Sequence, residues 1–299
     1  MNVLHILLSL LGLLAAGYIY IWGRSIAAAR AFVWPKPAEY VIGFVTNFFD
    51  TLGIGSFAPT TSAFKVMKLV PDERIPGTLN VGHTLPTIVE ALAIIALIAV
   101  DPLTLILLII ASILGAWLGA GIVARWPRRY VQVGMGLALV AAALLFTMKN
   151  LHMGPAGGHA IALHGTLLYV ALAGNFFLGA LMTLGIGLYA PAMIMIGLLG
   201  MDVKTAWPIM MGSCAFLMPV ASARFMKFNA YEFRAALGLA VGGVPGVLIA
   251  AYIVKSLDIR IVLWLVVAVV LYTAIMMLRS AYIERGRPPA VGAGAIAPE

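Results

Sequence analysis

Long apolar runs constrain this chain more than any other feature. A membrane-spanning helix needs about 20 apolar residues, and seven runs supply them, at about 4–23, 78–100, 103–124, 130–148, 206–223, 237–254 and 261–279. Only 10% of the 299 residues are charged, against about 25% in an ordinary soluble domain. We therefore expect an all-α polytopic membrane protein, which excludes a soluble enzyme, a disordered chain and a DNA-binding domain.

Two further apolar stretches, residues 40–64 and 167–199, are interrupted. Each contains Gly-Ile-Gly followed by a proline, at positions 53–55 with Pro59 and at positions 185–187 with Pro191. Each stretch is either a kinked span or a re-entrant hairpin. If both are hairpins and the N-terminus is outside, 15 of the 19 lysines and arginines lie inside, whereas two full crossings divide them 10 against 9. Because basic residues favour the cytoplasmic side, we expect seven crossings and two re-entrant hairpins, with the C-terminus in the cytoplasm.

The basic residues thus report topology and give no reason to expect nucleic acid as a partner. The first run has no basic n-region and no small-residue cleavage site, so we interpret it as an uncleaved helix. We expect five segments: an N-terminal transmembrane helix with a cytoplasmic link (1–36), a first repeat (37–150), an external loop (151–166), a second repeat (167–284) and a disordered cytoplasmic tail (285–299).

The two interrupted stretches belong to an internal repeat. Residues 51–59 and 183–191 agree at seven of nine positions, Asp72 matches Asp202, and Gly82 matches Gly212. The pairs Gly115-x-x-x-Gly119 and Gly242-x-x-x-Gly246 also correspond, and we interpret them as close helix contacts. Asn-Phe-Phe triplets at 47 and 175 match four residues out of step. Because each copy holds one hairpin and three crossings, an odd number, the copies form an inverted repeat, as in many secondary transporters.

The glycine turns predict a substrate site. Glycine lets the chain turn with positive φ and lets a ligand approach the backbone, and the half-helix after each turn would point its free N–H groups and positive dipole end into the protein. The alternative is that these residues only permit tight packing or a kink. The predicted substrate-binding residues are Thr51, Gly53, Gly55, Ser56, Thr60, Thr61, Thr183, Gly185, Gly187 and Tyr189.

Three ionisable residues lie inside apolar segments, where they are costly and usually functional. Asp50 precedes the first turn, and His83 and Glu90 lie two turns apart on one helix. We predict that they couple transport to protons; the alternatives are that Asp50 caps the hairpin and that His83 bonds a neighbouring backbone group. Their counterparts in the second copy are not ionisable, and that of Asp50 is Met182.

We expect no metal, no cofactor and no enzymatic activity. The spacing of His152, His159 and His164 matches no regular ligand pattern, and Cys214 is the only cysteine. The chain contains no Gly-Lys-Ser/Thr phosphate loop, no His-Glu-x-x-His and no Gly-x-Ser-x-Gly, so energy must come from an ion or substrate gradient.

The chain resembles the sulfite exporter family of the TauE/SafE type. The resemblance lies in the paired Leu-Gly-Ile-Gly turns followed by proline, in the Gly-Ala-Trp-Leu-Gly-Ala-Gly segment ending in Arg125-Trp-Pro127, and in the duplicated layout, and it covers residues 40–282. It implies a bacterial cytoplasmic (inner) membrane permease for sulfite, other inorganic sulfur anions or organosulfonates.

We therefore expect a secondary transporter of small anions, an exporter by family resemblance, that binds its substrate between two opposed hairpin tips and is coupled to protons. The alternative is a cation channel or carrier that uses Asp50 and Glu90 as ligands. A membrane enzyme or assembly factor is a third reading, and no catalytic constellation supports it.

Overall fold

The computed structural model describes residues 3–29, 32–52, 55–94, 100–153, 158–185, 187–253, 259–283 and 285. These residues form α-helices, two short 3-10 helices and connecting segments, and they contain no β-strand. The expectation of an all-α protein is therefore confirmed for the described part of the chain. Gly53, one of the predicted substrate-binding residues, lies outside it.

Helices appear where the apolar runs predict them. The predicted crossings correspond to α1 (Val3–Ala29), α4 (Ile75–Ile94), α5 (Pro102–Val123), α6 (Arg128–Asn150), α9 (Ala206–Lys227), α10 (Phe233–Ile253) and α11 (Ile259–Ile283). Each interrupted stretch is a pair of helices, α2 (Pro37–Thr51) with α3 (Phe57–Met67) and α7 (Gly165–Met182) with α8 (Tyr189–Leu198). The 3-10 helices η1 (Asp72–Arg74) and η2 (Val203–Thr205) precede α4 and α9.

Five of the described helices are long and apolar enough to cross a membrane, namely α1, α5, α7, α9 and α10. The chain is accordingly a membrane protein by the length and composition of its helices. Shorter apolar segments lie in α6 and α11, at Arg129–Leu145 and Val270–Ile283. Although the sequence predicts α7 as one arm of a hairpin, it is by itself as long as a short span, and it begins at Gly165, inside the predicted external loop.

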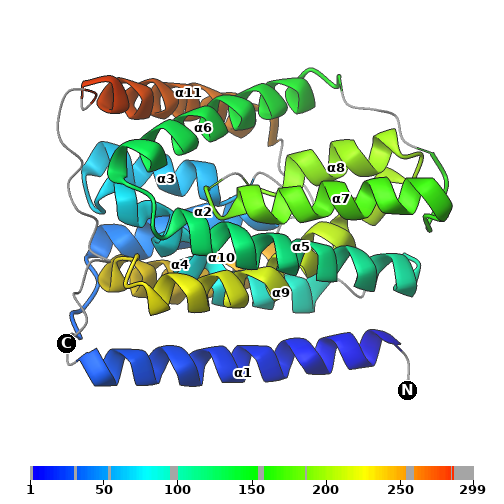
Figure 1. Cartoon of the computed structure of the whole chain (residues 1–299), viewed down its shortest axis with the longest axis horizontal. Helices are drawn as coiled ribbons and strands as arrows, with labels where there is room; N and C mark the ends of the chain where they lie inside the picture. Colours follow the sequence, from blue (N-terminus) through cyan, green and yellow to red (C-terminus); the bar gives the residue numbers. More distant parts are fainter. Residues whose placement is uncertain are drawn as a thin grey trace.

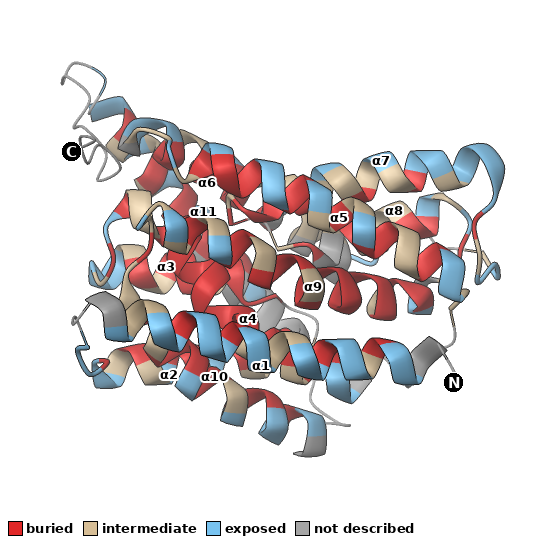
Figure 2. Ribbon diagram, turned by 60° about the horizontal axis from the view of Figure 1, so that its bottom comes forward, coloured by how far each residue is buried: buried red, intermediate tan, exposed pale blue. Residues whose placement is uncertain are grey.

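The helices pack as reciprocal pairs drawn from the two repeats (Figure 1). The first arm of each interrupted stretch packs on the other repeat, α2 on α10 and α7 on α5. At the centre α4 packs on α9, and on the outside α6 packs on α11. Helix α1 contacts α4 and α9 more lightly, and its surface is largely exposed whereas α9 is almost wholly buried (Figure 2).

Glycines allow the two arms to pack closely. A Cβ on Gly115 of α5 would lie 2.8 Å from the Phe176 carbonyl carbon of α7, and one on Gly242 of α10 would lie 2.9 Å from the Tyr40 carbonyl carbon of α2. Since only glycine permits backbones to approach this closely, the interpretation of both Gly-x-x-x-Gly pairs as helix contacts is confirmed.

The half-helices α3 and α8 occupy opposite halves of the long axis of the bundle. Figure 1 shows α3 in the half that contains the C-terminal end of α1 and α8 in the half that contains its N-terminal end. The first residues of both helices therefore lie near the middle of the bundle, where the interrupted segments turn.

Candidate functional site

The two turns bring helix N-termini to the middle of the molecule. Helix α2 ends at Thr51 and α3 begins at Phe57, with Gly55 at a φ of 90°. Helix α7 ends at Met182 and α8 begins at Tyr189, with Gly185 at a φ of 98°. Positive φ of this size is strained for any residue with a Cβ, so glycine is required at both of these positions.

Both turns contribute to one cavity, together with α2, α4 and α9. Its volume is about 10 Å³, which is space for about one water molecule. An oxyanion therefore needs the walls to move apart before it enters. The lining residues are Asp50, Gly55, Ser56, Phe57, Thr87, Met182, Gly187, Leu188 and Cys214.

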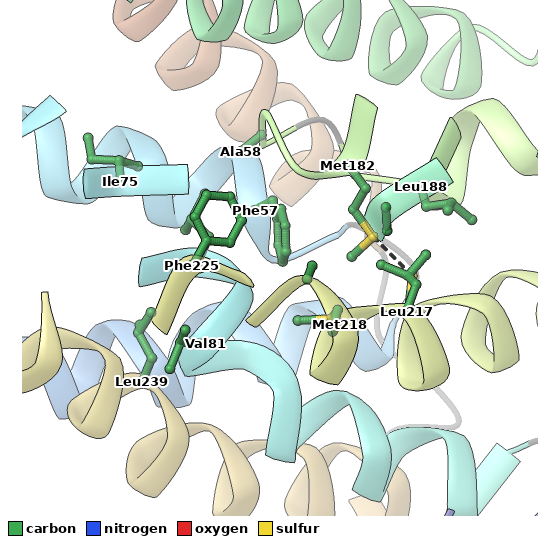
Figure 3. Close-up of a cluster of buried hydrophobic side chains, with 14 of the residues drawn as sticks. Phe57, Ala58, Ile75, Val81, Met182, Leu188, Leu217, Met218, Phe225 and Leu239 are labelled. Atoms are coloured by element: carbon green, nitrogen blue, oxygen red, sulfur yellow. Dashed lines mark hydrogen bonds between the residues drawn. The ribbon is translucent and has the colours of Figure 1, made fainter. Parts of the chain in front are cut away.

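Side chains from both hairpins meet beside this cavity. Phe57 of the first hairpin and Met182 and Leu188 of the second lie in one buried cluster (Figure 3). The Cys214 thiol of α9 lies 3.7 Å from the Met182 sulfur, the contact marked at Met182 in the figure. Thr61 of α3 also lies near the second turn, because a Cβ on Gly185 would be 3.9 Å from its Oγ1.

The N-terminal ends of α3 and α8 supply backbone N–H groups that are not bonded within their own helices. The first backbone bonds in these helices run from the Thr60 N–H to the Ser56 carbonyl and from the Ala192 N–H to the Leu188 carbonyl. The N–H groups before these positions have no acceptor within their own helix, and neither Ser56 nor Leu188 caps its helix with a side chain. Two helix N-termini with positive partial charge thus border the cavity.

Asp50 introduces the opposite charge. It is buried on the last turn of α2 and lines the cavity. Glu90 of α4 is also fully buried, but it is not among the residues that line the cavity. The cavity is therefore bordered by two helix N-termini and one acidic group, and the protonation of Asp50 decides whether the site favours an anion or a cation.

His83 links α2 and α3 through hydrogen bonds. Its Nδ1 lies 3.0 Å from Asn47 Oδ1, and its Nε2 lies 3.0 Å from Thr60 Oγ1. The Asn47 amide nitrogen donates to the Gly43 carbonyl at 2.7 Å, which directs its oxygen toward the imidazole. Thr60 Oγ1 is also 2.7 Å from the Ser56 carbonyl, to which it can donate.

These bonds have two arrangements with different numbers of protons. Nδ1 carries a proton in both, because it faces the Asn47 oxygen. If the Thr60 hydroxyl donates to the Ser56 carbonyl, it accepts from Nε2, and His83 is doubly protonated. If His83 is neutral, Nε2 accepts the Thr60 proton and the Ser56 carbonyl loses this donor. The protonation of His83 is thus connected to the first turn of α3, where Ser56 lines the cavity.

The second copy contains a non-ionisable version of this arrangement. Asn175 donates to Ser213 Oγ at 3.0 Å and to the Leu108 carbonyl at 2.6 Å. Ser213 follows Gly212 as His83 follows Gly82, so the two asparagines have equivalent partners although their triplets are out of step. The described carboxylates and the imidazole discussed above, Asp50, Glu90 and His83, therefore belong to the first copy.

The remaining predicted residues whose side chains are described do not line the cavity. The Thr51 and Thr183 hydroxyls donate to carbonyls of their own helices, Asn47 and Ala180. Thr61 is fully buried, and its hydroxyl has no hydrogen-bond partner among the described residues. Tyr189 opens α8, but its side chain is not among those described.

Five lining residues were not predicted as site residues, namely Phe57, Thr87, Met182, Leu188 and Cys214. Phe57 and Leu188 directly adjoin the predicted turns, and Thr87 lies between His83 and Glu90 on α4. Met182 is the counterpart of Asp50, so the repeat contained a signal for it. Cys214 follows Ser213 by one residue, and nothing in its neighbourhood in the sequence marks it. Comparison with protein-family models, curated proteins and solved structures finds no match for this chain.

Proposed function

We propose that this protein is a proton-coupled secondary transporter of small anions. One observation carries the proposal: the two turns and the Asp50 carboxylate border the same buried cavity. The helix N-termini favour an anion there, but an ionised carboxylate repels it. An anion therefore binds when Asp50 is protonated, and since such coupling is reciprocal, the anion and the proton each favour binding of the other.

The proposed architecture is an inverted repeat with two re-entrant hairpins. The reciprocal packing of α2 on α10 and of α7 on α5 supports it, as does the position of α3 and α8 in opposite halves of the bundle. The distribution of lysine and arginine supports seven crossings, an external N-terminus and a cytoplasmic C-terminus. In alternating access the hairpin tips then separate toward one side at a time, which also enlarges the small cavity.

The proposed substrates are sulfite, other inorganic sulfur anions and organosulfonates. Their oxygens suit backbone N–H donors at helix N-termini. The resemblance to TauE/SafE-type permeases favours export from a bacterial cytoplasm, which the outward gradient of the substrate itself must drive, because an inward proton gradient drives a co-transported anion inward. The proposed substrate contacts are the Ser56 hydroxyl and the backbone around Gly55, Gly187 and Leu188, with Thr61 and Tyr189 reached when the tips move.

Purified protein in liposomes tests this function. A pH gradient should drive accumulation of ³⁵S-labelled sulfite, and dissipating the gradient with a protonophore should abolish it. In Asp50→Asn, which is uncharged at every pH, anion flux should persist but lose its response to the pH gradient. Asp202→Asn makes the same change at a half-buried residue that precedes η2, away from the cavity lining, and should behave as wild type. Loss of the gradient response in both variants would contradict the role of Asp50.

The alternative is a cation carrier in which ionised Asp50 and Glu90 are the ligands. The burial of both carboxylates near Cys214 favours this alternative. It predicts flux of Na⁺ or another cation that Asp50→Asn abolishes, with no accumulation of labelled anion. Measuring ²²Na⁺ and ³⁵S flux in the same liposomes therefore separates the two functions.

A further inference from the structure

A pair of arginines lies at one end of the bundle, outside the proposed transport site. Arg224 is on the last turn of α9, and Arg125 follows the end of α5. The Arg224 guanidinium carbon lies 4.4 Å from the centre of the Trp117 ring, and that of Arg125 lies 4.5 Å from the centre of the Phe228 ring. Trp117 and Arg125 belong to the Gly-Ala-Trp-Leu-Gly-Ala-Gly segment that ends in Arg125-Trp-Pro127. The proposed transport site does not use this segment.

The two arginines each reach across the α5–α9 interface. A Cβ on Gly121 would lie 3.0 Å from the Arg224 guanidinium carbon, so this group lies flat against the α5 backbone. Gly121 is one helical turn from Arg125, and Phe228 is one turn from Arg224. Each arginine therefore contacts the segment that carries the other, which places both at the same end of this interface.

The pair lacks a negative partner within the described residues. Arg74 pairs with Glu232 and Arg234 pairs with Glu39, but neither Arg125 nor Arg224 has a described carboxylate partner. The Arg224 Nε is buried and has no described hydrogen-bond acceptor. Because two cations at one end of an interface repel each other, and stacked guanidinium groups keep their N–H edges available, the arrangement suits a bound anion.

The surroundings indicate the source of that anion. On α5, Leu114, Leu118 and Ile122 are spaced four residues apart and are 45–55% exposed. They form an exposed apolar stripe that leads toward Arg125, as expected of a surface that faces acyl chains. A free inorganic anion would use the guanidinium groups alone, whereas a phospholipid uses the stripe as well.

We propose that Arg125 and Arg224 bind the phosphodiester of an anionic phospholipid whose acyl chain lies along Leu114, Leu118 and Ile122. Trp117 and Phe228 orient the guanidinium groups, and the Gly121 backbone gives Arg224 room to lie flat. The site lies at the end of the bundle that the basic residues assign to the cytoplasm, where pockets of this kind bind lipid headgroups. It does not depend on the transported substrate.

Native mass spectrometry of the detergent-solubilised full chain tests the proposal. With phosphatidylglycerol and phosphatidylcholine of identical chains in equal amounts, the wild type should retain phosphatidylglycerol preferentially. The double variant Arg125→Gln/Arg224→Gln should lower its retention by about tenfold or more, since two charge-assisted contacts are lost. The control Arg129→Gln/Lys227→Gln removes the same charge from exposed residues of the same rim and should retain it as the wild type does.

Two further arms make the result decisive. Arg224→Lys keeps the positive charge but loses the planar stacking on Trp117. This single variant replaces the double variant if the latter folds poorly, and it should also weaken the retention of phosphatidylglycerol. Inorganic phosphate should leave the thermal stability of the wild type unchanged at concentrations where phosphatidylglycerol raises it. Equal retention of both lipids, an equal loss in the control variant, or stabilisation by phosphate alone would each overturn the proposal.

Discussion

Gly187→Ala adds one methyl group to the cavity without straining the backbone. The φ of Gly187 lies outside the left-handed region, and among the described residues no heavy atom beyond its chain neighbours lies within 4 Å of the position that a Cβ would take. The variant should therefore fold normally. Because Gly187 lines a cavity of about 10 Å³, the added methyl takes the space of about one water molecule.

The methyl group should weaken substrate binding more than it changes stability. Overpacking a filled site costs about 1–3 kcal/mol, which is about 5- to 150-fold in affinity. We expect this loss for sulfite or for whichever sulfur anion most raises the thermal stability of the purified wild-type protein. Titrating that anion against the melting temperature of wild type and variant measures it.

Gly12→Ala is the matched control, because the same change on exposed α1 also meets no atom within 4 Å. It should alter neither the affinity nor the flux. Unchanged affinity in Gly187→Ala, with the variant folded, would refute the placement of the substrate between the hairpin tips.

Three further predictions concern His83, the glycine contacts and a helix cap. Thr60→Ala removes the hydroxyl that His83 Nε2 and the Ser56 carbonyl share, so proton-coupled flux should fall as it does in His83→Gln, and Thr60→Ser should restore it. Gly242→Ala places a Cβ 2.9 Å from the Tyr40 carbonyl carbon, and it should lower the free energy of unfolding by about 1–3 kcal/mol, measured by denaturation in detergent. Asp101 caps α5 by accepting the Thr104 N–H at 2.8 Å, which lowers its pKa. Its removal in Asp101→Ala should cost about 1 kcal/mol; because the pKa is lower in the folded state, this difference should vanish as the pH falls through the lowered value.

The apolar runs and the matched glycine turns were sufficient to predict the helices and the positions of the breaks. A run of about 20 apolar residues adopts a helix in a bilayer, because its backbone N–H and C=O groups must form hydrogen bonds within the segment. Gly55 and Gly185 were informative for a similar reason, since positive φ is available to few other residues. The presence of two matched copies also strengthened the prediction, because a single Gly-Ile-Gly does not distinguish a turn from a tightly packed or kinked helix.

The orientation of individual side chains could not be predicted. Helix α9 is buried on nearly every side (Figure 2), so its apolar pattern does not identify the face that carries Cys214 toward the cavity. Thr51 and Thr183 occupy matched positions, but threonine readily bonds the carbonyl three or four residues before it, and both do so here. Only packing decides between such local bonds and a ligand.

The most direct test of proton-coupled anion binding is to count protons as the ligand binds. A sulfonate should be added to purified protein in weakly buffered detergent solution near neutral pH, where the sulfonate group itself does not titrate. We expect the wild type to take up protons as it binds and Asp50→Asn to bind with markedly less uptake. Binding by the wild type with no proton uptake, or identical uptake in Asp50→Asn, would contradict the coupling of Asp50 protonation to the anion.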